Sequence, residues 1–271
     1  MDDWKLRNDE SKSLDLISAG SEILGGSVGA AIGLLSGGPF GAIAGAVSAP
    51  VLIRAFKKVC AEFYDRQIGT RQRIRAGATA GFAIVQIKEK LDDGHKIRDD
   101  GFFDDKCPRS SAEEILEGVI IKSHNEHEEK KAEYYANIFV TAAFDNRFTP
   151  ESLNHFLSLA ERLTFRQLCI LQVFSSPHQF DLFDEEFNRN YLKTVPFEKM
   201  AVLHEMYDLY QLRLLKCQAP GDGEPDDYLA FDQIRPAWMF LNDLGENLRH
   251  LMQLQTIPQQ DLENLAIFFK E

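Results

Sequence analysis

The sequence predicts a mainly α-helical protein with a small winged-helix-like α+β segment near its carboxyl end. Three observations carry this prediction. A glycine falls at every fourth position from 25 to 45, apolar residues recur at three- and four-residue spacings through the middle of the chain, and short apolar runs flank a turn-rich loop in the last third. We therefore divide the chain into segments 1–110, 111–160 and 161–271.

The first segment is expected to contain a glycine-zipper helical hairpin. A spacing of four places successive glycines near one face of a helix, and a face without side chains allows close approach, as in the small-xxx-small seams of membrane helices. Residues 36–39 interrupt the run and would divide the uncharged stretch 23–53 into two arms of about 15 residues. The predicted helix-packing seam consists of Gly25, Gly29, Gly33, Gly37, Gly41 and Gly45.

A basic stretch follows the glycine-rich run. Residues 51–90 hold nine Lys and Arg residues against three Asp and Glu residues, whereas the whole chain has a net charge of −12. Cations beside an apolar segment attract anionic lipid, so we expect Arg54, Lys57 and Lys58 to contact lipid headgroups. The alternative is a soluble hairpin with a close-packed glycine seam, because each helical glycine costs about 1 kcal/mol relative to alanine unless packing offsets it.

The second segment is expected to be helical. Ser110 and Ser111 precede Glu113 and Glu114, a sequence typical of a helix start with acidic residues near the positive end of the dipole. Apolar residues at helical spacing follow on either side of the polar stretch HNEHEEKKAE: Ile115, Leu116, Val119, Ile120, Tyr134, Tyr135, Ile138, Phe139 and Ala142.

The polar stretch is the only dense cluster of His and Glu. His124 and Glu128 lie four residues apart, with Glu117 two turns before, and metal-bound helical bundles use such pairs together with ligands from other helices. No second segment of this kind exists, so we favour a solvated helical turn with an i,i+4 pair between Glu126 and Lys130. A metal enzyme centred on His124 and Glu128 is the alternative.

Motifs that would indicate catalysis are absent from the sequence. The glycine-rich run lacks the Lys-Ser/Thr ending of a phosphate loop, and no GxSxG motif occurs. We therefore predict no catalytic residue, no cofactor and no bound metal.

The third segment follows the order of a winged-helix domain: helices, a strand, a loop, a returning strand and a final helix beginning at Leu-Gly. The expected elements are helices over 163–174 and 197–212, a strand over 213–217, a loop over 218–227, a strand over 237–241 and a helix over 244–254. An irregular connection between helices is the alternative.

The charge of this segment is wrong for a nucleic-acid partner. The helix that would read DNA carries Glu198, Glu205 and Asp208 against Lys199, and the expected wing is acidic. DNA-binding domains place basic residues at these positions. We predict no nucleic-acid binding and favour a protein-contact or structural role.

Cysteine spacing and the chain start indicate the compartment. Cys60, Cys107, Cys169 and Cys217 lie far apart and are expected to be free thiols in a reducing cytosol. The acidic, polar start lacks the basic region of a secretory signal. We expect a cytoplasmic protein that binds the inner membrane peripherally or inserts conditionally.

About half of the chain resembles the bacterial abortive-infection alpha (Abi-alpha) family. The matching stretches are KKAEYYANIFVTAAFDN at 130–146, FLSLAERLTFRQLCILQVF at 156–174, LYQLRLLKC at 209–217 and LNDLGENLRHLM at 241–252. The last stretch departs from the family pattern, because Asn242 and Asp243 replace a Thr-Pro-type start. The resemblance implies defence against phage through death or arrest of the infected cell, and it carries over no catalytic residue.

These observations together predict a non-enzymatic antiphage effector. Its glycine hairpin is expected to oligomerise with further copies and to perturb the inner membrane, while the third segment binds a protein partner. The alternative is a soluble helical scaffold or the regulatory partner of another defence protein, in which the glycine seam is internal packing or a subunit interface.

Overall fold

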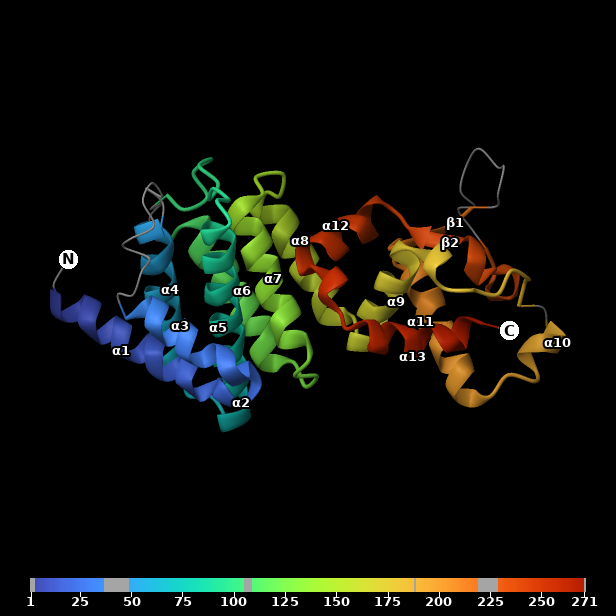
Figure 1. Ribbon diagram of the computed structural model, residues 1–271, viewed down its shortest axis with the longest axis horizontal. Helices are drawn as coiled ribbons and strands as arrows, with labels where there is room; N and C mark the ends of the chain where they lie inside the picture. Colours follow the sequence, from blue (N-terminus) through green and yellow to red (C-terminus); the bar gives the residue numbers. More distant parts are fainter. Residues whose placement is uncertain (1–2, 37–48, 105–108, 188, 219–228, 271) are drawn as a thin grey trace. The chain divides into compact units, whose positions relative to one another are not determined.

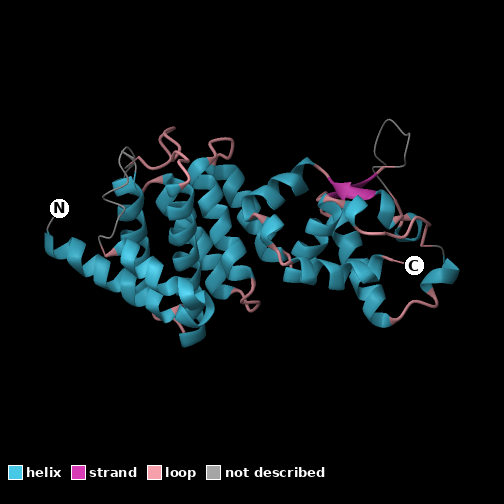
Figure 2. Cartoon of the chain, in the orientation of Figure 1, coloured by secondary structure: helices cyan, strands magenta, loops and turns pink. Residues whose placement is uncertain are grey.

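The chain is described by a computed structural model that is mainly helical, as predicted, with one small two-stranded antiparallel sheet (Figure 2). The contacts divide it into two compact units, Met1–Arg162 and Leu163–Glu271. The first two predicted segments therefore fold together as one unit. The residues that the structure describes are 3–36, 49–104, 109–187, 189–218 and 229–270.

The first unit is built from helices alone in its described part. They are α1 (Asp3–Ala19), α2 (Ser21–Leu24), α3 (Val28–Leu35), α4 (Ala49–Tyr64), α5 (Thr70–Asp92), α6 (Ser111–Asn125), α7 (Lys131–Phe144) and α8 (Pro150–Arg162), with a 3-10 turn at Gly25–Ser27.

Helix α5 is the centre of this unit. It packs on one side against α1, α2 and α3, and on another against α6 and α7, while α1 also packs on α4 (Figure 1). Small residues allow these close contacts, since Ala76, Gly77, Ala78, Ala80 and Gly81 of α5 are all buried. Part of the apolar surface of α1 to α3 is consequently buried against the body of the unit.

The glycine-rich stretch departs from the predicted hairpin in its described part. Residues 21–35 span the expected arm length of about 15 residues, but the arm is not one regular helix, because a 3-10 turn at Gly25–Ser27 separates α2 from the 8-residue α3. Gly25 lies before α3, in a 3-10 turn, with a φ of +57° that favours glycine. It therefore does not share a helical face with Gly29 and Gly33. Gly37, Gly41 and Gly45 lie outside the described residues.

Helices α6 and α7 confirm the apolar pattern of the second segment. All nine predicted apolar positions are buried. The Ser110 hydroxyl accepts a hydrogen bond from the Glu113 N–H at 3.2 Å, which caps α6 as the sequence predicted. Helix α6 ends at Asn125 and α7 begins at Lys131, however, so residues 126–130 form a turn between two helices.

The second unit combines short helices with the sheet. Its elements are α9 (Phe165–Ser175), α10 (Arg189–Leu192), α11 (Phe197–Gln211), β1 (Leu215–Cys217), β2 (Met239–Leu241), α12 (Asp243–Met252) and α13 (Gln259–Ala266), with 3-10 turns at Pro177–Gln179, Phe231–Gln233, Pro236–Trp238, Leu254–Thr256 and Ile267–Phe269.

The predicted strands pair as expected, with Leu215 opposite Leu241 and Cys217 opposite Met239. The expected loop between them lies outside the described residues from 219 to 228. The Asn242 side chain accepts the Gly245 N–H at 2.9 Å and caps α12, which gives a structural role to the residue that departs from the Abi-alpha pattern.

The structure also bears on the cysteine thiols and on whether a helix could span a membrane. Cys60, Cys169 and Cys217 are free and buried, as expected, and Cys107 lies outside the described residues. In the described part of the chain, each helix taken singly is too short or too polar to cross a membrane. The bent pair Arg7–Ala19 and Ser21–Leu35, with 57° between its helices, meets the length and composition criteria together.

Candidate functional site: the amino-terminal arm

The amino-terminal arm, defined here as α1 to α3, docks on α5 through glycines that the fourfold pattern does not contain. A Cβ atom placed on Gly77 would lie 2.0 Å from the Leu16 carbonyl oxygen, and one on Gly20 would lie 2.2 Å from the Ala78 nitrogen. Real Cβ atoms do not approach backbone atoms this closely, so any larger residue must displace a helix. Gly20 and Gly77 thus form a backbone-to-backbone contact between the arm and α5.

The contact continues one turn along α5. A Cβ atom on Gly81 would lie 2.4 Å from the Cδ1 atom of Leu24, whose side chain is buried. The partner here is the end of a flexible side chain. Gly20, Gly77 and Gly81, which we call the docking seam, were missed in the sequence. The signal that was available is the small-residue run ATAG in α5, but its partner lies about sixty positions away in the chain.

Helix α3 has two unlike faces. Ala31, Leu34 and Leu35 are buried against the body of the unit. Gly29 and Gly33, 40° apart around the helix from their spacing of four, are exposed, and no described atom lies within 4 Å of a Cβ atom placed on either. We call Gly29 and Gly33 the open glycine face. It is the described remnant of the predicted seam, and it faces away from the rest of the described chain.

The cations expected to contact lipid have partners within the chain. Lys57 pairs with Glu10 of α1 at 2.7 Å, and Lys58 pairs with the buried Glu113 of α6 at 2.6 Å. Arg54 also has an interaction partner. These residues therefore contribute to the packing of the first unit in this structure, and the headgroup contact stays a prediction.

Further ion pairs join the arm to the body. Lys12 of α1 pairs with Asp65, just after α4. Arg71 of α5 contacts Glu22 of α2 at 2.8 Å and, from its other side, Glu129 of the turn before α7 at 2.8 Å. Opposite charges thus meet along the arm on both sides of the docking seam.

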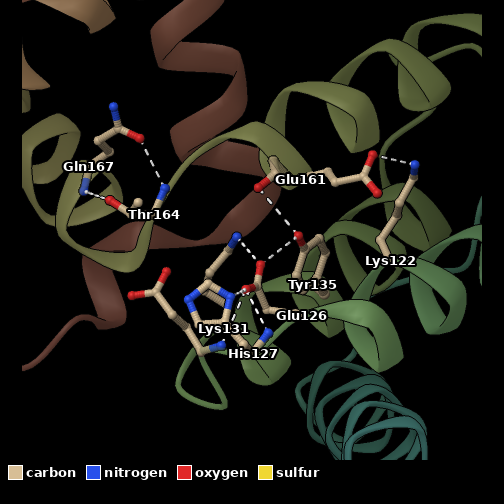
Figure 3. A network of polar contacts seen from close by, with 10 residues as sticks. Lys122, Glu126, His127, Lys131, Tyr135, Glu161, Thr164 and Gln167 are labelled. Atoms are coloured by element: carbon tan, nitrogen blue, oxygen red, sulfur yellow. Dashed lines mark hydrogen bonds and ion pairs between the residues drawn. The ribbon is translucent and has the colours of Figure 1, made fainter. Parts of the chain in front are cut away.

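The polar turn at residues 126–130 contains a buried network rather than the predicted solvated pair. The Glu126 carboxylate pairs with Lys131, whose side chain is only 1% exposed, and accepts the Tyr135 hydroxyl at 3.3 Å (Figure 3). It also accepts the backbone N–H groups of His127 and Glu128 at 2.9 and 3.2 Å. The predicted pairing of Glu126 with Lys130 is wrong, because the helix ends at Asn125 and the buried ammonium of Lys131 is the cation that needs a carboxylate.

Burial and hydrogen bonding shift the pKa values of two groups in this network. Burial alone would raise the pKa of Glu126, but the hydrogen bond from Lys131 and two backbone N–H groups lower it below its ordinary value. Burial, and then the charge of Glu126, raise the pKa of Tyr135. The single Tyr135 hydroxyl proton is shared between Glu126 and the Ala160 carbonyl, each 3.3 Å from the hydroxyl oxygen, which ties α8 to this network.

The geometry does not favour the alternative metal site centred on His124 and Glu128. Ligand atoms of Glu126, His127 and Glu128 lie within 4.8 Å of one another, but Glu126 already compensates Lys131, whose ammonium would repel a cation. His124 is directed elsewhere, since its Nδ1 atom lies 2.7 Å from the Ile121 carbonyl and its ring packs edge-on against Phe63. The structure does not bring His124 together with Glu128 as a ligand pair.

Comparisons with protein-family models, with curated proteins and with solved structures found no match for this chain. The resemblance to the Abi-alpha family therefore stays a prediction, and the proposals below rest on the chain's own residues.

Proposed function

We propose that the protein is a non-enzymatic effector of bacterial antiphage defence, of the abortive-infection type, which self-associates and perturbs the inner membrane through its amino-terminal arm. The observation that carries this proposal is the open glycine face of α3. Glycine in a helix costs about 1 kcal/mol relative to alanine, and at Gly29 and Gly33 no contact within the described chain offsets that loss.

The occupant that this face fits best is a second copy of the chain. A flat, uncharged glycine face is complementary to itself, and close van der Waals packing between such faces drives helix association in lipid. The same spacing continues in the sequence through Gly37, Gly41 and Gly45, which would extend the contact. The family resemblance favours death or arrest of the infected cell as the outcome of that association.

The second unit is proposed to bind a protein partner. Phe197 at the start of α11 is 88% exposed and Ile267 is 62% exposed, the two large apolar side chains most open to solvent among the described residues. Helix α11 packs against the 3-10 turn that contains Ile267. The charge of α11 disfavours a nucleic-acid partner, since Glu198 and Asp208 are exposed and Glu205 pairs with Arg166.

The experiment is leakage of dye from vesicles of phosphatidylethanolamine and phosphatidylglycerol. The double variant Gly29→Leu/Gly33→Leu should leak at least about tenfold less, corresponding to about 1.4 kcal/mol of lost association. Ala30→Leu is the comparison variant, because Ala30 is an exposed, non-glycine residue of α3 at the edge of the glycine face, three positions before Gly33; it should leak more than the double variant. Equal leakage by the double variant and the comparison variant would overturn the proposal.

The second candidate is a soluble scaffold or regulatory partner, and the pairing of Lys57 and Lys58 within the unit favours it. Flotation of the purified protein with the same vesicles separates the two. An effector should rise with the vesicles, whereas a scaffold should stay in the dense fraction.

A further inference from the structure

The amino-terminal arm contains an apolar stretch that is long enough to span a bilayer but is held against the protein. Residues 16–35 comprise 20 residues with Glu22 as their only charge, and about 20 apolar residues suffice for one crossing. Most of their larger side chains are nonetheless covered: Leu16, Ile17, Leu24, Leu34 and Leu35 are buried in the first unit, while Ile23, Val28 and Ile32 are half-buried.

Two ion pairs hold the amino-terminal part of the arm, one just before this stretch and one within its first half. Glu10 of α1 pairs with Lys57 of α4, and Glu22 of α2 pairs with Arg71 of α5. In each pair the arm supplies the carboxylate and the body supplies the cation. We call these two pairs the latch.

The latch is open to competition from solvent. The side chains of Arg71 and Glu22 are 50% and 61% exposed, and those of Lys57 and Glu10 are 19% and 33% exposed. The pair of Arg71 with Glu22 is weak in water because both partners are hydrated and screened, and the pair of Lys57 with Glu10 is partly hydrated. An anionic surface attracts a nearby cation with a free energy of similar size, so it can compete with Glu10 at Lys57 and with Glu22, one of the two carboxylates that contact Arg71.

We propose that anionic phospholipid headgroups take the place of Glu10 and Glu22 at Lys57 and Arg71, and that this exchange releases the arm into the bilayer. The inference rests on the proposed function and adds its regulation. The docked arm is the resting state, and the cations that hold it are the cations that meet the membrane. Arg71 exchanges first, because it is the more exposed of the two and its guanidinium can bind a phosphate through two hydrogen bonds.

Release exchanges one apolar environment for another. The leucines that leave the body of the unit enter lipid, and the two glycines of the open face, already exposed in the docked arm, can then pack against a second copy within the bilayer. The loss to be overcome is the docking seam, where Gly20 and Gly77 pack backbone against backbone. The exchange at the latch therefore controls whether the arm stays docked.

A zero-length carbodiimide tests this directly. The reagent couples an amine to an adjacent carboxylate, forming an amide while the carbodiimide takes up the water as a urea. Lys57 and Glu10, 2.7 Å apart, should yield a linked peptide in buffer and on phosphatidylcholine vesicles. On vesicles of equal parts phosphatidylglycerol and phosphatidylcholine its yield should fall about fivefold or more.

The internal reference is the pair Lys122–Glu161, which joins α6 to α8 away from the arm. Its linked peptide should form equally on both kinds of vesicle. An unchanged Lys57–Glu10 yield on the anionic vesicles, or no binding of the protein to them, would overturn the latch.

Leakage of the coupled protein separates the latch from the proposed function. Coupling should abolish leakage by the parent. It should not abolish leakage by the double variant Lys12→Arg/Lys57→Arg, which keeps the charges of both α1 pairs but offers the reagent no amine at these two positions. Leakage by the coupled parent at the untreated rate would overturn the latch while leaving membrane activity intact. If neither protein leaks before coupling, the proposed function fails, and the peptide yields on the two vesicles still decide the latch.

Discussion

Two sets of glycines in the first unit have opposite surroundings. The docking seam, Gly20, Gly77 and Gly81, is buried between the arm and α5 and leaves no room for a Cβ atom. The open glycine face, Gly29 and Gly33, is exposed and has no described neighbour within reach. Both sets contain two glycines four residues apart, Gly77 and Gly81 in the docking seam and Gly29 and Gly33 on the open glycine face. Periodicity thus identifies residues that share a face, but it does not show which face the protein itself covers.

The largest expected change in stability comes from the Glu126–Lys131 pair, and it should leave the docking of the arm unchanged. Glu126→Gln should lower the free energy of unfolding by about 3 kcal/mol, because the buried Lys131 ammonium loses its carboxylate. Urea denaturation measures this. The Lys57–Glu10 coupling yield of the folded variant should match that of the parent, since the network does not touch the arm. A reduced yield would mean that the coupling yield follows the global stability of the protein and not the docking of the arm alone.

The same variant has a defined pH dependence. The pKa of Glu126 is lowered in the folded state, so its contribution to stability is fully present above the ordinary carboxyl range and is lost only as the pH falls through that lowered pKa. The difference in stability between parent and variant should therefore hold from neutral pH down to the ordinary carboxyl range, shrink below it, and disappear once the pH lies below the lowered pKa. A difference that vanished near neutral pH would contradict the buried pairing with Lys131.

The docking seam is tested by adding one methyl group. Gly77→Ala should destabilise the docked arm by about 2 kcal/mol, because its Cβ atom meets the Leu16 carbonyl oxygen, a backbone atom that cannot move alone. The expected result is a lower Lys57–Glu10 coupling yield and leakage at a lower fraction of anionic lipid.

Gly81→Ala is the matched control on the same helix. Its Cβ atom meets only the Leu24 side chain, which can change rotamer, so the yield should fall less than in Gly77→Ala. Equal losses in both variants would contradict the distinction between a backbone contact and a side-chain contact.

The sequence predicted features that depend on neighbouring residues, but not contacts between residues far apart in the chain. Local signals were sufficient for the Ser110 cap, the two strands and the apolar faces of α6 and α7, because each rests on neighbouring residues. The approach of Gly20 to Gly77 joins residues nearly sixty positions apart, and no local spacing encodes it. The Glu126–Lys131 pair was missed because a continuous helix was assumed where the chain turns at residues 126–130.

The open glycine face should respond in the opposite direction to the seam. Gly29→Ala is expected to stabilise the isolated protein by a little under 1 kcal/mol, since alanine favours the helix and the added methyl group meets no described atom. Thermal unfolding of the soluble protein measures the gain. Destabilisation would show that another part of the chain covers this face.

The smallest effect concerns the latch. Glu10→Gln should weaken arm docking by about 0.5 kcal/mol at low salt, because the pair with Lys57 is partly exposed. The difference from the parent should shrink as salt is added, since screening weakens the pair in the parent and leaves the neutral variant unaffected. Coupling of the second α1 pair, Lys12–Asp65, reports docking in both proteins without using Glu10. A difference between the two that is independent of salt would mean that Glu10 holds the arm through packing, and the comparison would then rest on the glycine seam alone.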